Sequence, residues 1–163
     1  MRLYHGSTLS IPRPDVVHSR DNLDFGRGFY LTSYREQAQR WARRKAAIER
    51  RQAIVNVYEF SCDLTGIRVL EFSENDEDWV EFVCECRRGR NLSDGYDLVI
   101  GGVADDKVYE AVNMYFKGFW DMQTTLSALR FYGRNDQYCF VTQGALDRLV
   151  SFVDSYEVGN GDN

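Results

Sequence analysis

Short stretches of the chain alternate between apolar and polar residues, and this period of two predicts β-strands. The stretch AIVNVYEF shows the alternation up to its end at residue 60 and predicts a strand over residues 54–60. A buried strand is predicted over residues 96–101, where YDLVIG is mostly apolar. Further strands are predicted over residues 2–6, 28–32, 68–72, 137–142 and 150–158.

Other stretches repeat their apolar residues every three to four positions, which predicts amphipathic helices. The segment WVEFVCEC at residues 79–86 shows this spacing, and acidic residues precede it, where negative charge stabilises a helix N-terminus. Ser33 and Glu36 have the spacing of a capping box, so a helix is predicted over residues 34–51. Further helical segments are predicted over residues 104–116, 123–132 and 144–149.

The order of these elements indicates the fold class. Strands cluster toward the two ends of the chain, with helices between them and no regular β-α-β alternation, which favours an α+β fold over a doubly wound one. A length of 163 residues, 44% of them hydrophobic, provides one hydrophobic core. We therefore expect a single domain over residues 1–158, followed by a flexible tail at residues 159–163.

Charge and composition narrow the classes of function. A formal charge of −5 argues against a dedicated nucleic-acid binder, although it leaves a locally held nucleic-acid substrate open. Basic residues concentrate in residues 35–51, where a solvated helix face is favoured over a binding patch. No apolar run approaches the roughly 20 residues that cross a bilayer, and the N-terminus lacks the apolar stretch of a signal peptide. The sequence therefore predicts a cytoplasmic protein with no membrane partner.

The four cysteines do not predict a metal centre. Their spacing is not that of zinc ligands, and their density is below that of a secreted disulfide scaffold. We expect reduced thiols that are mostly buried as small apolar side chains.

Three short strings place a polar or aromatic group beside glycines or at a strand end: YHGS at residues 4–7, DFGRGFYLTS at residues 24–33 and NDQYCF at residues 135–140. Their candidate functional residues are His5, Tyr30 and Gln137. A structural role is an alternative for each, since a single strand histidine or aromatic residue is usually part of a core. Gly26 and Gly28 favour a functional role for Tyr30, because glycines inside a strand region suggest tight curvature or a closely approaching ligand.

The combination and order of the three strings resemble the ADP-ribosyltransferase fold of the diphtheria-toxin and poly-ADP-ribose polymerase branch, which carries a His-Tyr-Glu triad on three strands. More narrowly, DFGRGFYLT and YDLVIGGVADD resemble the DUF3990 family of bacterial proteins, which is grouped with these transferases. The resemblance implies split antiparallel β-sheets with helices, and NAD as the substrate.

The resemblance also implies roles for individual residues. His5 would hydrogen-bond a ribose hydroxyl of NAD, and Gly6 would let the backbone approach the nicotinamide carboxamide. Tyr30 would stack on the nicotinamide ring, and Tyr34 could cover the opposite face. The expected catalytic residues are His5, Tyr30 and Gln137, and the expected NAD-binding residues are His5, Gly6, Ser7, Arg20, Arg27, Gly28, Phe29, Tyr30 and Tyr34.

The loop over residues 7–27 is long for a compact domain, and such loops tend to be functional. Arg20 and Arg27 are candidates for binding the pyrophosphate of NAD, because a guanidinium can hold two phosphate oxygens at once. Solvent exposure is the equal alternative for each. His18 is expected to be structural, and Asp24 is expected to brace the loop.

Gln137 occupies the position where the resemblance expects glutamate. A carboxylate stabilises a developing cation and activates a hydroxyl group, whereas an amide only orients groups by hydrogen bonds. This departure argues against a chain-extending polymerase and leaves transfer of a single ADP-ribose. Asp105 or Asp106 could supply the missing carboxylate, although caps of the following helix are the simpler interpretation.

The leading hypothesis is therefore a mono-ADP-ribosyltransferase that cleaves NAD at the nicotinamide–ribose bond and passes ADP-ribose to a protein or nucleic-acid acceptor. Such a bacterial domain would suit a toxin of a toxin–antitoxin pair, with a small antitoxin protein as partner, or an anti-phage effector. One alternative is an NAD glycohydrolase, in which water is the acceptor. Another is a non-catalytic NAD-binding or interaction module.

Overall fold

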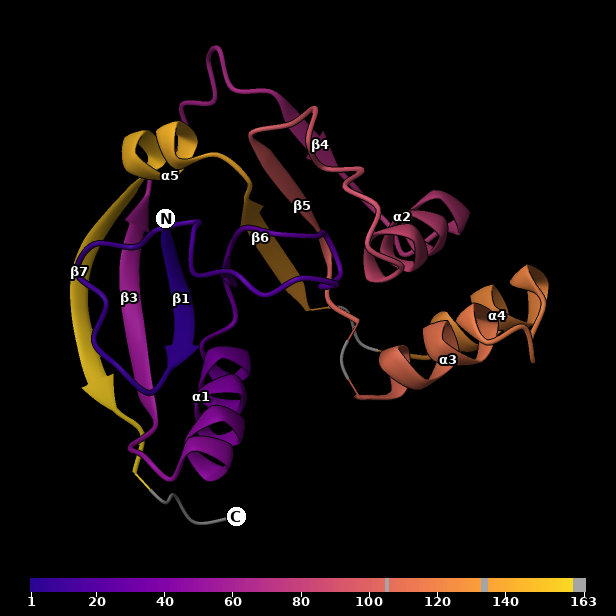
Figure 1. The fold of residues 1–163 in the computed structure, drawn as a ribbon, viewed down its shortest axis with the longest axis horizontal. Coiled ribbons are helices and arrows are strands. Elements are labelled where there is room, and N and C mark those ends of the chain that lie inside the picture. The colour runs from indigo at the N-terminus through magenta and orange to yellow at the C-terminus, as the bar shows by residue number, and fades with distance from the viewer. Residues whose placement is uncertain (105, 133–134, 160–163) are drawn as a thin grey trace.

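The computed structural model describes residues 1–104, 106–132 and 135–159. Figure 1 shows two β-sheets side by side, with helices at their flanks. The first sheet has the order β1-β3-β7 and consists of β1 (Arg2–Ser7), β3 (Ile54–Phe60) and β7 (Val150–Glu157). The second has the order β2-β6-β5-β4 and consists of β2 (Phe29–Leu31), β4 (Val69–Glu71), β5 (Leu98–Gly102) and β6 (Asp136–Phe140).

The helices of the described chain are α1 (Arg35–Glu49), α2 (Glu77–Arg87), α3 (Asp106–Phe116), α4 (Met122–Leu129) and α5 (Gln143–Leu149). Each strand and helix expected from the sequence is present, with small differences at its ends, and the α+β class is confirmed. Asp105, the side chain of Asp106 and residues 160–163 of the expected tail lie outside the described residues.

The second sheet departs from the expected antiparallel arrangement. β4 and β5 run parallel, with Leu70 opposite Val99, whereas β2, β5 and β6 pair in antiparallel fashion. A parallel pair needs a crossover connection, and α2 lies within the connection between β4 and β5. Asp76 caps α2 by accepting a hydrogen bond from the backbone of Trp79 at 3.0 Å, as its acidic start predicts.

A shared apolar core and one short backbone bridge join the two sheets. Tyr4 in β1 donates its N–H to the carbonyl of Thr32 at 2.8 Å, and the N–H of Thr32 donates to Tyr4 at 3.0 Å. The bridge places the middle of β1 beside the residue that follows β2. Seven large side chains of the core between the sheets are fully buried: Leu3, Leu31, Tyr58, Leu98, Phe140, Leu146 and Leu149.

Helix α1 begins without the predicted capping box. Its N-cap residue is Tyr34, which makes no side-chain cap bond. The hydroxyl of Ser33 donates instead to the carboxylate of Asp136, which also accepts the backbone N–H of Ser33 at 2.8 Å. The prediction from Ser33 and Glu36 is therefore correct for the helix and wrong for its cap, because a carboxylate distant in sequence binds Ser33.

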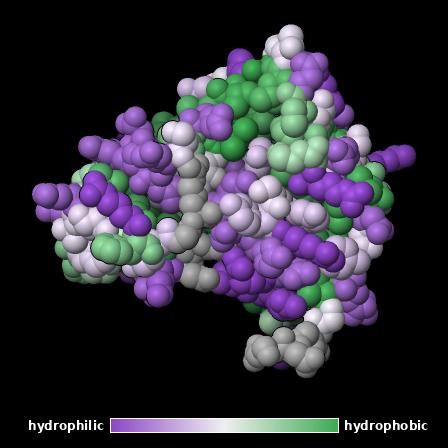
Figure 2. All heavy atoms as spheres, turned by 180° about the vertical axis from the view of Figure 1, so that it is seen from behind, coloured by the Kyte–Doolittle hydropathy of each residue, from purple (hydrophilic) through white to green (hydrophobic). Residues whose placement is uncertain are grey.

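The surface and the thiols agree with the composition. No described helix is long and apolar enough to cross a membrane. Figure 2 shows hydrophilic side chains over much of one face, with a hydrophobic area near its upper edge. Cys84, Cys86 and Cys139 are buried and Cys62 is exposed, and all four are free thiols, as expected.

Gly6 is the point of closest contact between β1 and α1. A Cβ atom at this position would collide with the carbonyl oxygen of Ala38 and lie 2.6 Å from the backbone nitrogen of Ala42. Both alanines are fully buried, so neither the helix nor the strand has room to move. The glycine therefore sets the distance at which α1 packs on the first sheet.

We predict that Gly6→Ala lowers the free energy of unfolding by about 1–3 kcal/mol, the usual cost of overpacking a core. Urea denaturation followed by circular dichroism measures this loss. Gly144→Ala is the matched control, because a Cβ there meets nothing within 4 Å. It should leave the stability unchanged or raise it by roughly 0.5–1 kcal/mol. Equal stability of the two variants would contradict the tight packing of α1 on Gly6.

Candidate functional site

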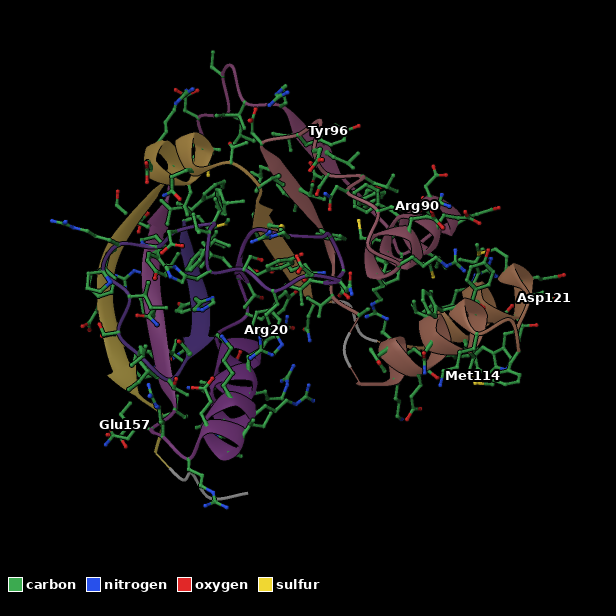
Figure 3. All side chains as sticks on the ribbon, viewed as in Figure 1. Arg20, Arg90, Tyr96, Met114, Asp121 and Glu157 are labelled. Carbon is green, nitrogen blue, oxygen red and sulfur yellow. The ribbon has the colours of Figure 1, made fainter. Side chains whose placement is uncertain are left out.

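A cavity of about 1110 Å³ lies where the ends of β1, β2 and β6 meet α1, α3 and the long loop. Its volume is slightly above the roughly 300–1,000 Å³ typical of ligand sites. His5, Tyr30 and Gln137, from three separate motifs, all line it. Figure 3 labels Arg20, another lining residue, beside α1. In all, five further residues expected in the site also line the cavity: Gly6, Ser7, Arg20, Gly28 and Phe29.

His5 is held in one tautomer by its neighbours. Its Nδ1 lies 2.7 Å from the carbonyl oxygen of Tyr30 and must donate to it, so Nε2 carries the lone pair of a neutral ring. Burial, together with the positive charge of Lys45, lowers the pKa of His5 to about 4. The ring also stacks on Phe29, with centroids 4.6 Å apart. His5 therefore offers a hydrogen-bond acceptor, Nε2, that no described residue engages.

The same contact frees the backbone of Gly6. Tyr4 bonds to Thr32 across the sheet junction, so in a continuous antiparallel ladder Gly6 would bond to Tyr30. The His5 ring takes the Tyr30 carbonyl instead. By the alternation along β1, the N–H and C=O of Gly6 face away from β3, and no described residue pairs with them. Gly6 thus presents an adjacent donor and acceptor at the cavity wall.

Tyr30 has its hydroxyl fixed and its ring at the cavity. The hydroxyl donates to the carbonyl of Gly26 at 2.6 Å and accepts the N–H of Phe25 at 3.1 Å. Burial raises the pKa of Tyr30 well above its ordinary value, so the phenol stays protonated. Gly26 has a φ of +77°, which favours glycine, and Tyr30 fastens this turn. A cavity-lining ring held this way has little freedom to rotate.

The glycines of the second motif serve packing as well as backbone geometry. A Cβ on Gly28 would lie 2.5 Å from the sulfur of Cys139 and 2.6 Å from the carbonyl oxygen of Phe140. Gly28 therefore allows the loop to approach β6. The interpretation of Gly28 as room for a ligand is incomplete, because the atoms closest to it belong to Cys139 and Phe140 of β6.

Gln137 is bonded to a carboxylate. Its side-chain Nε2 donates to Asp24 Oδ2 at 3.1 Å and to the carbonyl of Gly102 at 3.1 Å. Asp24 also accepts the backbone N–H of Ala104, and its other oxygen accepts two bonds from Arg87, at 3.0 and 2.6 Å. The expectation that Asp24 braces the loop is confirmed, since it ties the loop to α2, to β6 and to the segment after β5.

Positively charged side chains at the cavity come from α1 and the long loop. Arg44 and Lys45 line the cavity together with Trp41 from the same helix, and Arg20 comes from the loop. Burial lowers the pKa of Lys45, and the charge of Arg20 lowers it further, which places the two cations near each other. Arg43 and Arg44 are exposed, as a solvated helix face predicts, whereas Lys45 is partly buried at the cavity. The sequence signal for the cavity side was present, because positions 41, 44 and 45 share one helix face.

Two expected site residues lie elsewhere. Arg27 does not line the cavity; it donates to the carbonyl of Val17 at 3.3 Å and pairs with Asp21 at 3.5 Å. Tyr34 is 43% exposed at the start of α1 and is also absent from the cavity wall. His18, expected to be structural, does line the cavity and pairs with Asp15 at 2.7 Å. The alternative of solvent exposure therefore describes Arg27 better than a place in the cavity wall.

Comparison with known families decides the membership of the chain. A family model described as "Protein of unknown function (DUF3990)" matches residues 1–152. The chain belongs to the DUF3990 family. No curated protein and no solved structure matches it. The region shared with DUF3990 contains β1, β2 and β6 in full, so the whole wall formed by His5, Tyr30 and Gln137 lies within the family match.

Among the described residues, no cluster of three His, Cys, Asp or Glu side chains is arranged to hold a metal ion. The cavity of this DUF3990 protein combines a neutral imidazole acceptor, a backbone donor and acceptor, an aromatic face and two charged regions.

We predict that His5 remains neutral, with its proton on Nδ1, down to about pH 4. Because this pKa lies below the ordinary value of about 6.5, the unfolded chain takes up the proton first, and His5 contributes a loss of stability between about pH 6.5 and pH 4. Long-range ¹H–¹⁵N NMR of the imidazole gives both the tautomer and the titration. A midpoint near pH 6.5 would contradict the buried, carbonyl-bound ring.

Proposed function

We propose that the cavity binds NAD and that the protein is a mono-ADP-ribosyltransferase. The observation that carries the proposal is the grouping of His5, Gly6 and Tyr30 on one wall. A primary carboxamide has one acceptor oxygen and an amino group that donates, and the free N–H and C=O of Gly6 complement that pair. The Tyr30 ring offers a stacking surface for the nicotinamide. His5 Nε2 is an acceptor for a ribose hydroxyl.

The basic side of the cavity supports a dinucleotide over free nicotinamide. Arg20 and Lys45 provide positive charge for the two phosphates, in a region where partial burial strengthens charge-assisted hydrogen bonds. Trp41 adds an aromatic surface from α1. The cavity volume of about 1110 Å³ is large enough for an extended ligand with two nucleoside halves.

In the proposed reaction, the bond between C1′ of the ribose and the nicotinamide nitrogen breaks, and its electron pair leaves with neutral nicotinamide. The ribose then carries positive charge shared between C1′ and the ring oxygen. A nucleophile of the acceptor forms the new bond to C1′ and loses a proton to solvent or a base. Fixed dipoles accelerate such a step by stabilising the charge that develops, and Gln137 and Asp24 both line the cavity.

We predict that the wild-type protein releases nicotinamide from NAD and that Gln137→Ala lowers kcat by about 100-fold, the order expected for loss of one preorganised dipole. Chromatographic assay of nicotinamide measures the rate. Gln123→Ala is the matched control, because Gln123 is exposed on α4, and it should keep the wild-type rate. Circular dichroism checks that each variant is folded.

The fate of the ADP-ribose distinguishes the candidate activities. With NAD labelled in the adenylate and a cell lysate present, label attached to protein or nucleic acid supports the transferase, and protease or nuclease treatment identifies the acceptor class. Free labelled ADP-ribose alone indicates the hydrolase. NAD binding without nicotinamide release by the wild type would establish a binding module and contradict catalysis.

We also predict that Lys45→Gln raises the Kd for NAD about tenfold, because one charge-assisted hydrogen bond contributes roughly 1.5 kcal/mol. Arg43→Gln is the control: Arg43 lies on the same helix, is exposed and does not line the cavity. Isothermal titration calorimetry at two salt concentrations measures both affinities. Equal affinities of the two variants would show that Lys45 does not bind NAD.

A further inference from the structure

We propose that Asp24, the one lining carboxylate that is hydrogen-bonded to Gln137 among the described residues, is a positioning residue that acts through that amide. The inference rests on the proposed function and assigns the role of a missing acidic side chain to a hydrogen-bonded pair. Asp24 and Gln137 come from the loop before β2 and from β6, and both line the cavity. They are joined by the bond of 3.1 Å between Gln137 Nε2 and Asp24 Oδ2.

The orientation of the amide follows from its partners. Asp24 Oδ2 and the carbonyl oxygen of Gly102 are both acceptors, so both must face the NH₂ group of Gln137. Both amide hydrogens are thereby used. The remaining polar atom of Gln137 is Oε1, an acceptor with no hydrogen-bond partner among the described residues. The pair therefore presents a carbonyl oxygen to a ligand and withholds the amide donor.

The ion pair between Asp24 and Arg87 has its negative partner at the cavity. Arg87 binds Asp24 through two hydrogen bonds to Oδ1, and its guanidinium lies over the ring of Tyr109, 4.7 Å from the centroid. Asp24 lines the cavity, whereas Arg87 does not. Both side chains of the ion pair are only 14% exposed, so solvent screens the pair weakly. The negative end of the pair is thus the end nearer to the cavity.

A carboxylate that accepts a hydrogen bond from an amide N–H draws positive character to that hydrogen and increases the negative charge on the amide oxygen. Asp24 therefore makes Gln137 Oε1 a stronger acceptor for a ribose hydroxyl and a better partner for a positive C1′. The arrangement predicts that Gln137 cannot simply be replaced by glutamate. Two carboxylates at 3.1 Å would repel each other, and one of them would take up a proton.

The test transposes the charge between the two positions. Asp24→Asn and Gln137→Glu should each lower kcat for nicotinamide release about tenfold or more, with a smaller change in KM. The double variant Asp24→Asn/Gln137→Glu restores one carboxylate and one amide in exchanged places. The kcat of the double variant should be at least about tenfold higher than that of the slower single variant, because effects of directly bonded residues are not additive. The Gly102 carbonyl keeps a donor in every variant, from Trp79 Nε1 at 3.1 Å.

Asp97→Asn is the matched control, since Asp97 also holds an arginine through two bonds, to Arg68, but lies outside the cavity wall. It should keep the wild-type kcat. Thermal melting shows that each variant is folded at the assay temperature. A Gln137→Glu protein faster than wild type, an unchanged Asp24→Asn protein, or a double variant no faster than either folded single variant would each overturn the role of Asp24 alone. A wild type that releases no nicotinamide would overturn the proposed function as well.

Discussion

The two hydrogen bonds between Tyr4 and Thr32 are the junction on which the rest of the site depends. They hold the edge of one sheet against the edge of the other for a single residue pair. Beyond that pair the ladder does not continue, because the His5 ring occupies the carbonyl of Tyr30. A continuous sheet would have no cavity at this point. Interrupting it after one bridge exposes the backbone of Gly6 and holds the Tyr30 carbonyl against the imidazole.

The interrupted junction is stabilised from both sides. Helix α1 packs directly on Gly6, which keeps β1 from moving outward. On the other side, Asp24 joins the loop to α2 and β6, and Tyr30 fastens the turn at Gly26. The cavity wall is therefore built on a strand, a helix and a braced loop. Such preorganisation is what a site needs if it is to stabilise charge without rearranging.

The charges around the cavity are separated. Lys45 lowers the pKa of His5 and Arg20 lowers that of Lys45, so positive charge gathers near β1 and α1. Asp24 lies beside Gln137, and its charge contributes to the raised pKa of Tyr30. A ligand with an anionic part and a part that becomes cationic would match this separation. NAD, during loss of nicotinamide, is such a ligand, and this charge match is a further reason for the proposed function.

The sequence by itself determined the elements and the three motifs that contribute His5, Tyr30 and Gln137 to the cavity wall. Alternation and helical spacing located the strands and helices, since these patterns reflect which face of each element is buried. The motifs around His5, Tyr30 and Gln137 were visible because each lies within a few residues of a strand end.

Tertiary structure alone decided which side chains and strands are partners. Segments distant in the chain are joined by the bond from Ser33 to Asp136, by the pairing of Asp24 with Arg87 and by the parallel pairing of β4 with β5. Tertiary structure also places Lys45 at the cavity. Local patterns record burial and backbone geometry, but they carry no information about which distant side chain supplies the charge or the hydrogen bond.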